Sequence, residues 1–265
     1  MFIFSIYTQL NMNICLFTPE EVNKPIPPHD ERAEHIIKIL HKKCGDSFTA
    51  GIIGGKAGTA VITSIVPKGT PDAGSINFSF TPENDGKPLY PLTLIVGFPR
   101  PIQLRRLFRD AAGLGVKEIH LTGTELGEKS YMQSSLIESG SAYKMLMDGT
   151  AQAGGTHIPD IHTHINLQDC LKVAAAKNTI LIAPDNIRPS VSITDFLSKN
   201  RPVTPEKIPI PVIAAIGSER GWTNTERELL ERYGFIRCSM GTRILRTETA
   251  ATVAASLILS AMQVI

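Results

Sequence analysis

The chain has 265 residues, of which 42% are apolar and 20% charged, an ordinary composition for a globular protein. Its formal net charge of +2 excludes a strongly basic chain, so any nucleic-acid surface must be a local patch. The four cysteines are scattered and form no CxxC pair. This spacing argues against a disulfide framework or a zinc site and favours a reducing cytoplasm.

The two apolar ends of the chain do not predict membrane association. The run Met1–Ile6 lacks a basic segment and soon meets polar residues, so we do not expect a signal peptide. The stretch Ala250–Ile265 is interrupted by polar residues such as Thr252 and Ser256, which favours a buried helix over a membrane span. We therefore expect a cytoplasmic protein without membrane contact.

The first part of the chain, residues 1–85, is dominated by short strand-like runs. A helix is expected over Asp30–His41, where apolar residues recur at helical spacing. The runs Ser47–Ile53 and Thr59–Val66 flank a glycine-rich turn, which predicts a β-hairpin. Short strands of this kind are expected to form a small β-barrel. The segment Thr81–Pro88 concentrates chain-breaking residues and is expected to be a linker.

From residue 86 to residue 265, strand-like and helical runs alternate. The expected strands are Leu92–Val96, Glu118–Leu121, Thr179–Ala183 and Val212–Ile216. The expected helices are Gln103–Leu114, Asn224–Tyr233 and Thr249–Met262. This alternation predicts βαβ units and an α/β fold with a parallel sheet.

A first candidate site follows the strand Val212–Ile216. Ligands of open α/β sheets bind beyond the carboxyl ends of strands, and Gly217 and Gly221 would let the backbone approach a ligand closely. A tight turn that serves only the fold is the alternative, because Thr223 and Glu226 have the spacing of a helix capping box.

A second candidate site follows the run Ile236–Met240. Arg243, Arg246 and Glu248 gather close behind Gly241, just before or within the start of the last helix. Arginine recognises phosphates and bases through paired hydrogen bonds. A surface ion cluster is the alternative interpretation.

The two junctions, in this order, resemble one known family. Residues 216–222 read Ile-Gly-Ser-Glu-Arg-Gly-Trp, and residues 240–250 read Met-Gly-Thr-Arg-Ile-Leu-Arg-Thr-Glu-Thr-Ala. Both are similar to motifs of the ribosomal RNA small subunit methyltransferase E family, a branch of the SPOUT superfamily. Weaker similarities extend the resemblance from about Ile14 to Gln263, including Gly45-Asp46 and Lys129-Ser130.

The resemblance implies a fold and a reaction. The fold is a PUA-like β-barrel that binds RNA, over residues 1–85, followed by a SPOUT α/β domain with a C-terminal trefoil knot, over residues 86–265. The reaction is methylation of N3 of a uridine in 16S rRNA of the small ribosomal subunit, with S-adenosyl-L-methionine as cofactor. Members of the family act as homodimers.

The resemblance also implies roles for individual residues. The cofactor would be bound by ten residues of the two loops: Ile216, Gly217, Ser218, Glu219, Gly221, Met240, Gly241, Arg243, Ile244 and Leu245. Uracil N3 must lose a proton, which Glu219 or Glu248 would accept while Arg243 or Arg246 stabilises the anion. The expected RNA-binding residues are Arg100, Arg105, Arg106, Arg109 and Lys129.

Several departures from the family pattern leave two alternatives open. Ser218 and Arg220 stand where the family has Pro and Gly, and Asp110, Gly113 and Gly155 stand where it has Lys, Glu and Arg. In the first alternative, the chain methylates another RNA. In the second, it is an RNA-binding homologue that has lost activity.

A histidine string is the one pattern that suggests a metal. His157, His162 and His164 lie close in sequence, but no cysteine or acidic cluster completes them except Asp160. We therefore expect no metal site.

Overall fold

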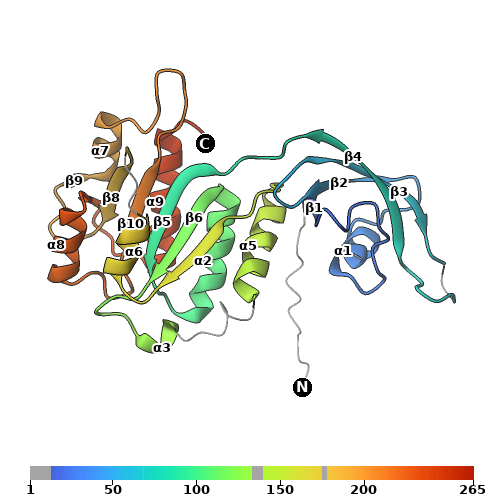
Figure 1. Cartoon of the computed structure of the whole chain (residues 1–265), viewed down its shortest axis with the longest axis horizontal. Coiled ribbons are helices and arrows are strands. Elements are labelled where there is room, and N and C mark those ends of the chain that lie inside the picture. The colour runs from blue at the N-terminus through green and yellow to red at the C-terminus, as the bar shows by residue number, and fades with distance from the viewer. Residues whose placement is uncertain (1–12, 68, 133–139, 175–177) are drawn as a thin grey trace. The chain divides into compact units, whose positions relative to one another are not determined.

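The computed structural model describes residues 13–67, 69–132, 140–174 and 178–265 (Figure 1). The N-terminal run in which we expect no signal peptide lies outside these residues. No described helix is long and apolar enough to cross a membrane. The chain forms two compact units: the described residues up to Pro88 with Thr150–Ile158, and Leu89–Gly149 with Pro159–Ile265. No sequence pattern had indicated that Thr150–Ile158 joins the first unit.

The first unit contains a four-stranded sheet in the order β1-β2-β3-β4. Its strands are β1 (Cys15–Phe17), β2 (Ser47–Ile52), β3 (Ala57–Ile65) and β4 (Ile76–Asn84). The predicted hairpin is confirmed, because β2 and β3 pair antiparallel. The predicted helix is α1 (Glu31–Glu34), which continues into the π-helical turn η1 (His35–Ile39).

One core holds the first unit together. Alternate residues of β2 and β3 point inward, as Phe48, Ala50, Ala60 and Ile62 show. They pack with aromatic residues, among which the Phe17 and Phe78 rings lie 4.8 Å apart.

The prediction of a linker over Thr81–Pro88 is wrong for the first half of this segment. Residues Thr81–Asn84 continue β4, which pairs with β3 as far as Ala57 and Asn84. Pro82 is tolerated because β4 is an edge strand, where a missing N–H breaks no ladder. The opposing residue is Gly58, at which a Cβ would lie 2.1 Å from the Thr81 carbonyl oxygen.

The second unit is built on a seven-stranded parallel sheet, in the order β7-β6-β5-β10-β8-β11-β9. Its strands are β5 (Tyr90–Gly97), β6 (Val116–Thr122), β7 (Asp160–His164), β8 (Ile180–Pro184), β9 (Val191–Ser192), β10 (Val212–Ile216) and β11 (Ile236–Ser239). The helices are α2 (Pro101–Leu114), α3 (Lys129–Met132), α5 (Ser141–Gln152), α6 (Leu167–Ala174), α7 (Ile193–Lys199), α8 (Asn224–Arg232) and α9 (Thr247–Ala261). The predicted α/β fold with a parallel sheet is confirmed.

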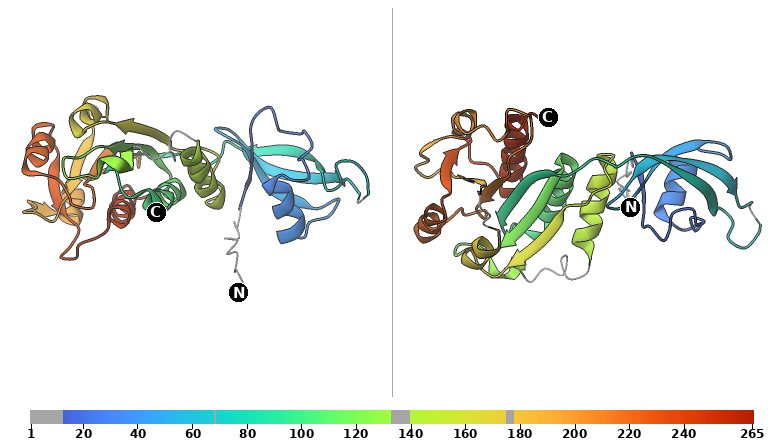
Figure 2. Two further views of the ribbon diagram at one scale, coloured as in Figure 1. Left: turned by 90° about the horizontal axis from the view of Figure 1, so that it is seen from below. Right: turned by 45° about the horizontal axis from the view of Figure 1, so that its top comes forward.

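Helices cover both faces of this sheet (Figure 2). On one face, Leu171 of α6 and Leu230 of α8 pack with Ile95 and Ala215 of the central strands. On the other face, α9 packs against α2, β5 and β10. The central strand β10 is buried along its whole length, so the loop that follows it starts from a rigid base.

Candidate functional site

The structure brings the two candidate loops together around one cavity of about 280 Å³. The cavity lies at the carboxyl ends of β8, β10 and β11. All ten residues predicted to bind the cofactor line it. They are Ile216, Gly217, Ser218, Glu219 and Gly221 from the first loop, and Met240, Gly241, Arg243, Ile244 and Leu245 from the second.

The first loop is a tight turn that requires glycine. The Gly221 N–H donates to the Ser218 carbonyl oxygen at 2.8 Å, and Gly221 has a φ of +73°. A Cβ at Gly217 would lie 2.9 Å from the Gly221 backbone. A side chain at either position would therefore open the turn.

The predicted capping box is present at the start of α8, and it also joins two loops. Glu226 Oε2 accepts from the Thr223 N–H and Oε1 from the Glu125 N–H, both at 2.9 Å. Thr124 Oγ1 donates to Ser218 Oγ at 3.0 Å. The turn therefore serves the fold, as the alternative interpretation held, and also forms one wall of the cavity.

Glu219 is held at the cavity by Arg100. Glu219 Oε1 accepts from the Arg100 N–H at 3.2 Å and lies 3.5 Å from Arg100 Nε. Arg100 is the N-cap residue of α2, where a carboxylate is favoured by the helix dipole. Arg100, which was predicted to bind RNA, therefore contacts Glu219, which is a candidate proton acceptor.

The second loop is open and exposed. Gly241 has a φ of +108°, and a Cβ there would contact nothing within 4 Å. In the described part of the chain, the exposed Arg243 side chain forms no hydrogen bond or ion pair, including none with Glu248. Ile244 is 85% exposed, which is unusual for an isoleucine. The backbone and the Arg243 guanidinium are therefore free to meet a ligand.

Arg246 and Glu248 lie outside the lining of the cavity. Arg246 is exposed at the N-cap of α9. Glu248 lies in the first turn of α9 and is 2% exposed, and its Oε1 has no hydrogen-bond partner among the described residues. The structure therefore does not bring these two residues together with Glu219 and Arg243.

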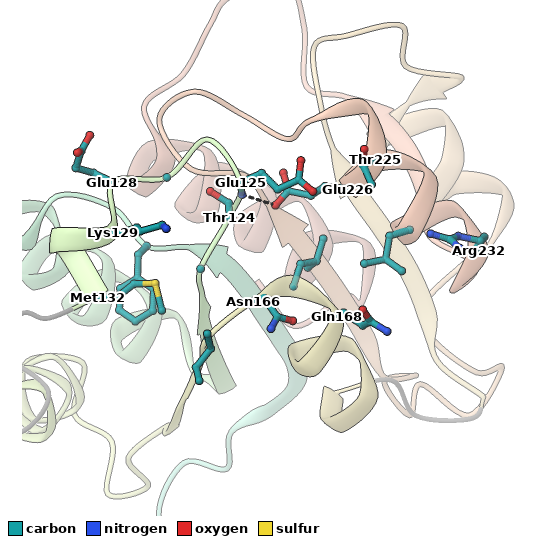
Figure 3. Close-up of a pocket in the computed structure, with 16 residues that line it drawn as sticks. Thr124, Glu125, Glu128, Lys129, Met132, Asn166, Gln168, Thr225, Glu226 and Arg232 are labelled. Carbon is teal, nitrogen blue, oxygen red and sulfur yellow. Dashed lines mark hydrogen bonds between the residues drawn. The ribbon is translucent and has the colours of Figure 1, made fainter.

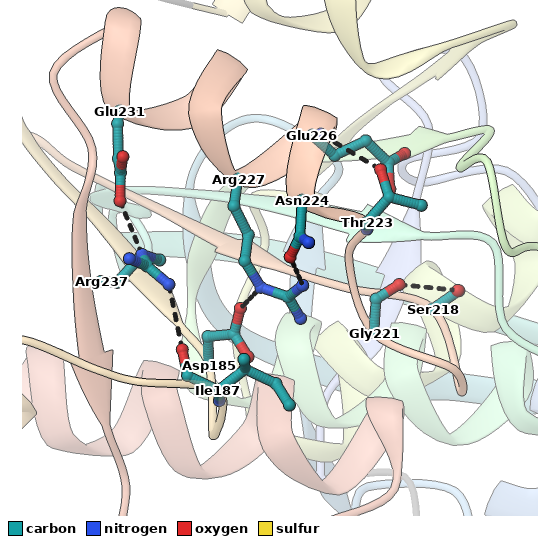
Figure 4. Close-up of polar contacts among 10 residues, drawn as sticks. All are labelled: Asp185, Ile187, Ser218, Gly221, Thr223, Asn224, Glu226, Arg227, Glu231 and Arg237. Atoms are coloured by element: carbon teal, nitrogen blue, oxygen red, sulfur yellow. Dashed lines mark hydrogen bonds and ion pairs between the residues drawn. The ribbon is translucent and has the colours of Figure 1, made fainter.

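A third loop, which the sequence analysis missed, completes the cavity. It follows β8 and contributes Pro184–Ile187. Arg227 Nε of α8 lies 2.6 Å from Asp185 Oδ2, and the two side chains are only 12% and 4% exposed (Figure 4). The Asp185 N–H donates to the carbonyl oxygen of Cys238 at the end of β11. The apolar run ending at Ala183, followed by Pro, Asp and Asn, was the available signal.

The four predicted RNA-binding cations other than Arg100 divide between two places. Arg105, Arg106 and Arg109 are exposed on α2, and Arg106 also lies 3.7 Å from Asp110. Lys129 lines a larger cavity of about 620 Å³, between the loop after β6 and helices α6 and α8. Figure 3 shows Lys129 and Arg232 on opposite sides of this cavity. Size alone would favour the larger cavity as the ligand site, but the glycine-rich loops surround the smaller one.

Comparisons with known proteins are consistent across sequence and structure. The family model described as the RNA methyltransferase domain matches residues 85–259. Ribosomal RNA small subunit methyltransferase E of Treponema pallidum is 37% identical over 252 residues, which cover 94% of this chain and 91% of the relative. Ribosomal RNA small subunit methyltransferase E 1 of Borreliella burgdorferi is 34% identical over 247 residues, which cover 93% and 97%.

Solved structures share the fold. A methyltransferase of Legionella pneumophila, in complex with the cofactor SAM, has a TM-score of 0.72 at 22% identity, with 94% of this chain and 98% of that chain covered. A ribosomal RNA small subunit methyltransferase E of Neisseria gonorrhoeae, bound to S-adenosyl methionine, has a TM-score of 0.66 at 21% identity, with 94% and 97% covered.

Proposed function

This chain belongs to the ribosomal RNA small subunit methyltransferase E family, and we propose that it methylates N3 of a uridine in 16S rRNA with S-adenosyl-L-methionine. The observation that carries the proposal is the single cavity at which both family motifs meet. We place the reaction in the cytoplasm, since all four cysteines are free thiols.

The residues of the cavity fit the cofactor. Gly217 and Gly241 bring bare backbone to its wall, and the φ of +108° at Gly241 disfavours any side chain there. Trp222, which also lines the cavity, has a buried Nε1 without a partner among the described residues. The indole packs in the core with residues of the sheet, α6 and α8, so the backbone of the loop, rather than this N–H, would contact the cofactor.

The chain's own residues would handle charge during the reaction. The bound cofactor supplies an activated methyl group: the N3–C bond forms as the S–C bond breaks, and the uracil N3 proton leaves to a base. Arg243 is exposed at the cavity and its side chain has no partner among the described residues, so we assign it to stabilise the uracil anion. Glu219 lines the cavity and is the better placed proton acceptor, whereas Glu248 is buried outside it.

Two regions would bind the RNA. Arg105, Arg106 and Arg109 on α2 would track phosphates. The larger cavity has Lys129 and Arg232 among its lining residues, together with three glutamates, and it lies beside the first loop through the Thr124–Ser218 hydrogen bond. We propose that it receives a nucleotide flanking the target.

The finer features of the architecture are also proposals. We assign the four-stranded sheet of the first unit to a PUA-like barrel that binds RNA, within residues 1–85. We assign residues 86–265 to a SPOUT domain with a trefoil knot, because the chain leaves β11 near one edge of the sheet and returns as α9 against the central strands.

We also propose a homodimer with the cavity near its interface. Ile244 lines the cavity and is 85% exposed, and Ile102, two residues after the N-cap of α2, is 80% exposed. Arg100 of that N-cap contacts Glu219, which lines the cavity, so α2 begins beside the first loop. Apolar side chains in this position are typical of an interface.

Mass spectrometry of rRNA nucleosides tests the function. A strain lacking the gene should lose 3-methyluridine from its 16S rRNA, and the purified protein should restore it on isolated small subunits with S-adenosyl-L-methionine. Loss of a methylated nucleoside from another RNA instead would refute the assigned substrate.

The second candidate, an RNA-binding homologue without activity, rests on the changed family positions. Asp110, which stands in place of a lysine, accepts a hydrogen bond from Thr252 of α9 at 3.2 Å and so joins two helices. Calorimetric titration with S-adenosyl-L-methionine separates the candidates, because an inactive binder has no need of the cofactor.

A further inference from the structure

Three histidines and a glutamate lie on one face of strands β6 and β7, away from the proposed active site. The parallel register pairs Glu118 with Asp160, His120 with His162 and Thr122 with His164. Paired residues of neighbouring strands point to the same face. Here that face is the one covered by α6, because His120 is also in register with Ile95, which packs with α6.

In the sequence, the histidine string has no cysteine or acidic cluster beside it that would complete a metal site, and we expected none. His157 does belong elsewhere, since it lies in the first unit and Nδ1 is 3.1 Å from the Lys87 carbonyl oxygen. His162 and His164, however, meet His120 and Glu118, which come from a strand more than forty residues earlier. The topology of the sheet therefore supplies the missing partners.

His120 is the centre of this group. It is 2% exposed, and its ring stacks on His162 and His164 at centroid distances of 4.6 and 5.1 Å. Its Nδ1 lies 2.9 Å from His164 Nε2, which is a hydrogen-bond distance. When Nδ1 carries the shared proton, the lone pair of Nε2 points the opposite way, toward Glu118.

The separation between His120 Nε2 and Glu118 Oε2 is 3.4 Å, which is long for a hydrogen bond. It is the span of two ligand atoms on one zinc ion: bonds of about 2.0–2.2 Å at a tetrahedral angle give an edge of roughly 3.4 Å. Ligand atoms of Glu118, His120 and His162 all lie within 4.8 Å of one another. Small rotations of the exposed His162 side chain would bring its ring nitrogen within bonding distance of the same ion.

We propose that Glu118 Oε2, His120 Nε2 and His162 form a zinc-binding site, with solvent as the fourth ligand. His164 is a positioning residue, because its hydrogen bond to Nδ1 orients the His120 ring, as second ligand shells do in zinc proteins. Lys117 Nζ lies 2.9 Å from Glu118 Oε1 and leaves Oε2 for the ion. The bound ion would fasten the edge strand β7 to β6.

The alternative set of His120, His164 and Cys170 is less suitable. It would use His120 Nδ1, which His164 already occupies. Cys170 is fully buried, so an entering ion has no access to its thiol from solvent. Glu118 and His162 are both accessible to an entering ion.

Titration of the metal-free, untagged full chain with Zn²⁺ tests the site, with Co²⁺ as a visible probe of ligand geometry. We expect one equivalent of Zn²⁺ to bind, and the affinity to fall at least tenfold in Glu118→Gln and His162→Ala and in the positioning variant His164→Ala. The matched control is His29→Ala, which removes an exposed histidine of the first unit and should bind as the wild type does.

Folding of the variants is checked by their melting temperatures in the absence of metal. That of His162→Ala should stay near the wild-type value because His162 is exposed. His164→Ala should melt lower, because it removes the hydrogen-bond partner of the buried His120 Nδ1. Zn²⁺ should raise the melting temperature of the wild type and of His29→Ala more than that of the site variants. The proposal is overturned if the wild type binds no Zn²⁺ at micromolar concentration. It is equally overturned if His29→Ala and His162→Ala lose affinity to the same extent.

Discussion

Arg243 is the residue on which the proposed chemistry most depends. It is exposed at the cavity and forms no side-chain bond with a described residue, so Arg243→Ala should lower the unfolding free energy by only about 0.5 kcal/mol. Methyl transfer should fall roughly a hundredfold or more if the guanidinium stabilises charge in the transition state. Cofactor affinity, measured by calorimetry, should change less than the rate.

The control for this variant is Arg201→Ala, which removes an exposed arginine outside the cavity lining. It should leave methyl transfer unchanged. Full activity of Arg243→Ala on small-subunit RNA would exclude a catalytic role for Arg243. A parallel loss of melting temperature and cofactor binding would instead assign Arg243 to holding the loop.

Gly241 offers a test of the cofactor site that does not depend on RNA. A Cβ at this position contacts nothing, so the effect of Gly241→Val comes from backbone strain at a φ of +108°. We expect the altered loop to abolish binding of S-adenosyl-L-methionine in calorimetry. Gly45→Val is the matched control, because Gly45 has a φ of +93°, equally open space and a place in the first unit. Wild-type affinity in Gly241→Val would show that the loop is wrongly assigned.

Helix α8 is joined to the third loop by the Arg227–Asp185 ion pair, and this pair should matter for stability. Arg227→Ala would leave the nearly buried Asp185 carboxylate without its cation, at a cost of about 3–5 kcal/mol. Glu231→Ala breaks a pair of similar length, 2.7 Å to Arg237, that is far more exposed, and should cost no more than about 1 kcal/mol. Urea unfolding followed by the single tryptophan, Trp222, measures both. Equal losses would contradict the role given to burial.

Arg32 of helix α1 donates hydrogen bonds to the Leu16 carbonyl oxygen and to the Glu21 carboxylate. Because the bonds to Glu21 depend on an ionised carboxylate, the stability of the first unit should fall in acid. Hydrogen bonds from Arg32 lower the pKa of Glu21. Burial acts to raise the pKa of Asp30, but hydrogen bonds from Arg32 outweigh it, so this pKa is also lowered. Both carboxylates therefore contribute stability that is present above their unfolded pKa values, near 4, and is lost as the pH falls through the folded values.

Hydrogen exchange of the β2 and β3 amides measures this effect. Their protection in the wild type should fall as the pH drops below about 4–5, after correction for the intrinsic exchange rate. In Arg32→Ala protection should be lower at neutral pH and should change less with acid. An unchanged pH dependence in this variant would show that other groups control the acid response.

Elements with a strong apolar period could be predicted from the sequence, and those set by tertiary context could not. The strand Val212–Ile216 was predicted to the residue, because a central strand buried on both faces is a continuous apolar run. The edge strand β7, Asp-Ile-His-Thr-His, carries polar residues on both faces and gave no period. Both loops of the candidate site were visible through their glycines, but the ion pair of the third loop joins residues 42 positions apart.

At the scale of the whole molecule, the structure changes the reason for expecting a dimer. The run Ala250–Leu259 is apolar on more than one face, which by itself would favour a place in a dimer interface. Within one chain, however, α9 already buries Ala251, Ala255, Ile258 and Leu259, among other residues, against neighbouring elements. The unexplained apolar surface is instead the rim of the cavity, where Ile244 is 85% exposed.

Ile244→Asp therefore tests the dimer. If the rim is an interface, an aspartate there places an unpaired charge in an apolar contact, which costs several kcal/mol and corresponds to at least a hundredfold weaker association. Sedimentation equilibrium at micromolar concentration should show a wild-type dimer and a monomeric variant. Ile208→Asp is the control, because Ile208 is also well exposed, at 60%, and lies outside both cavities. A monomeric wild type would rule out the dimer. A dimeric Ile244→Asp would place the interface elsewhere and leave the exposed isoleucine to contact the RNA.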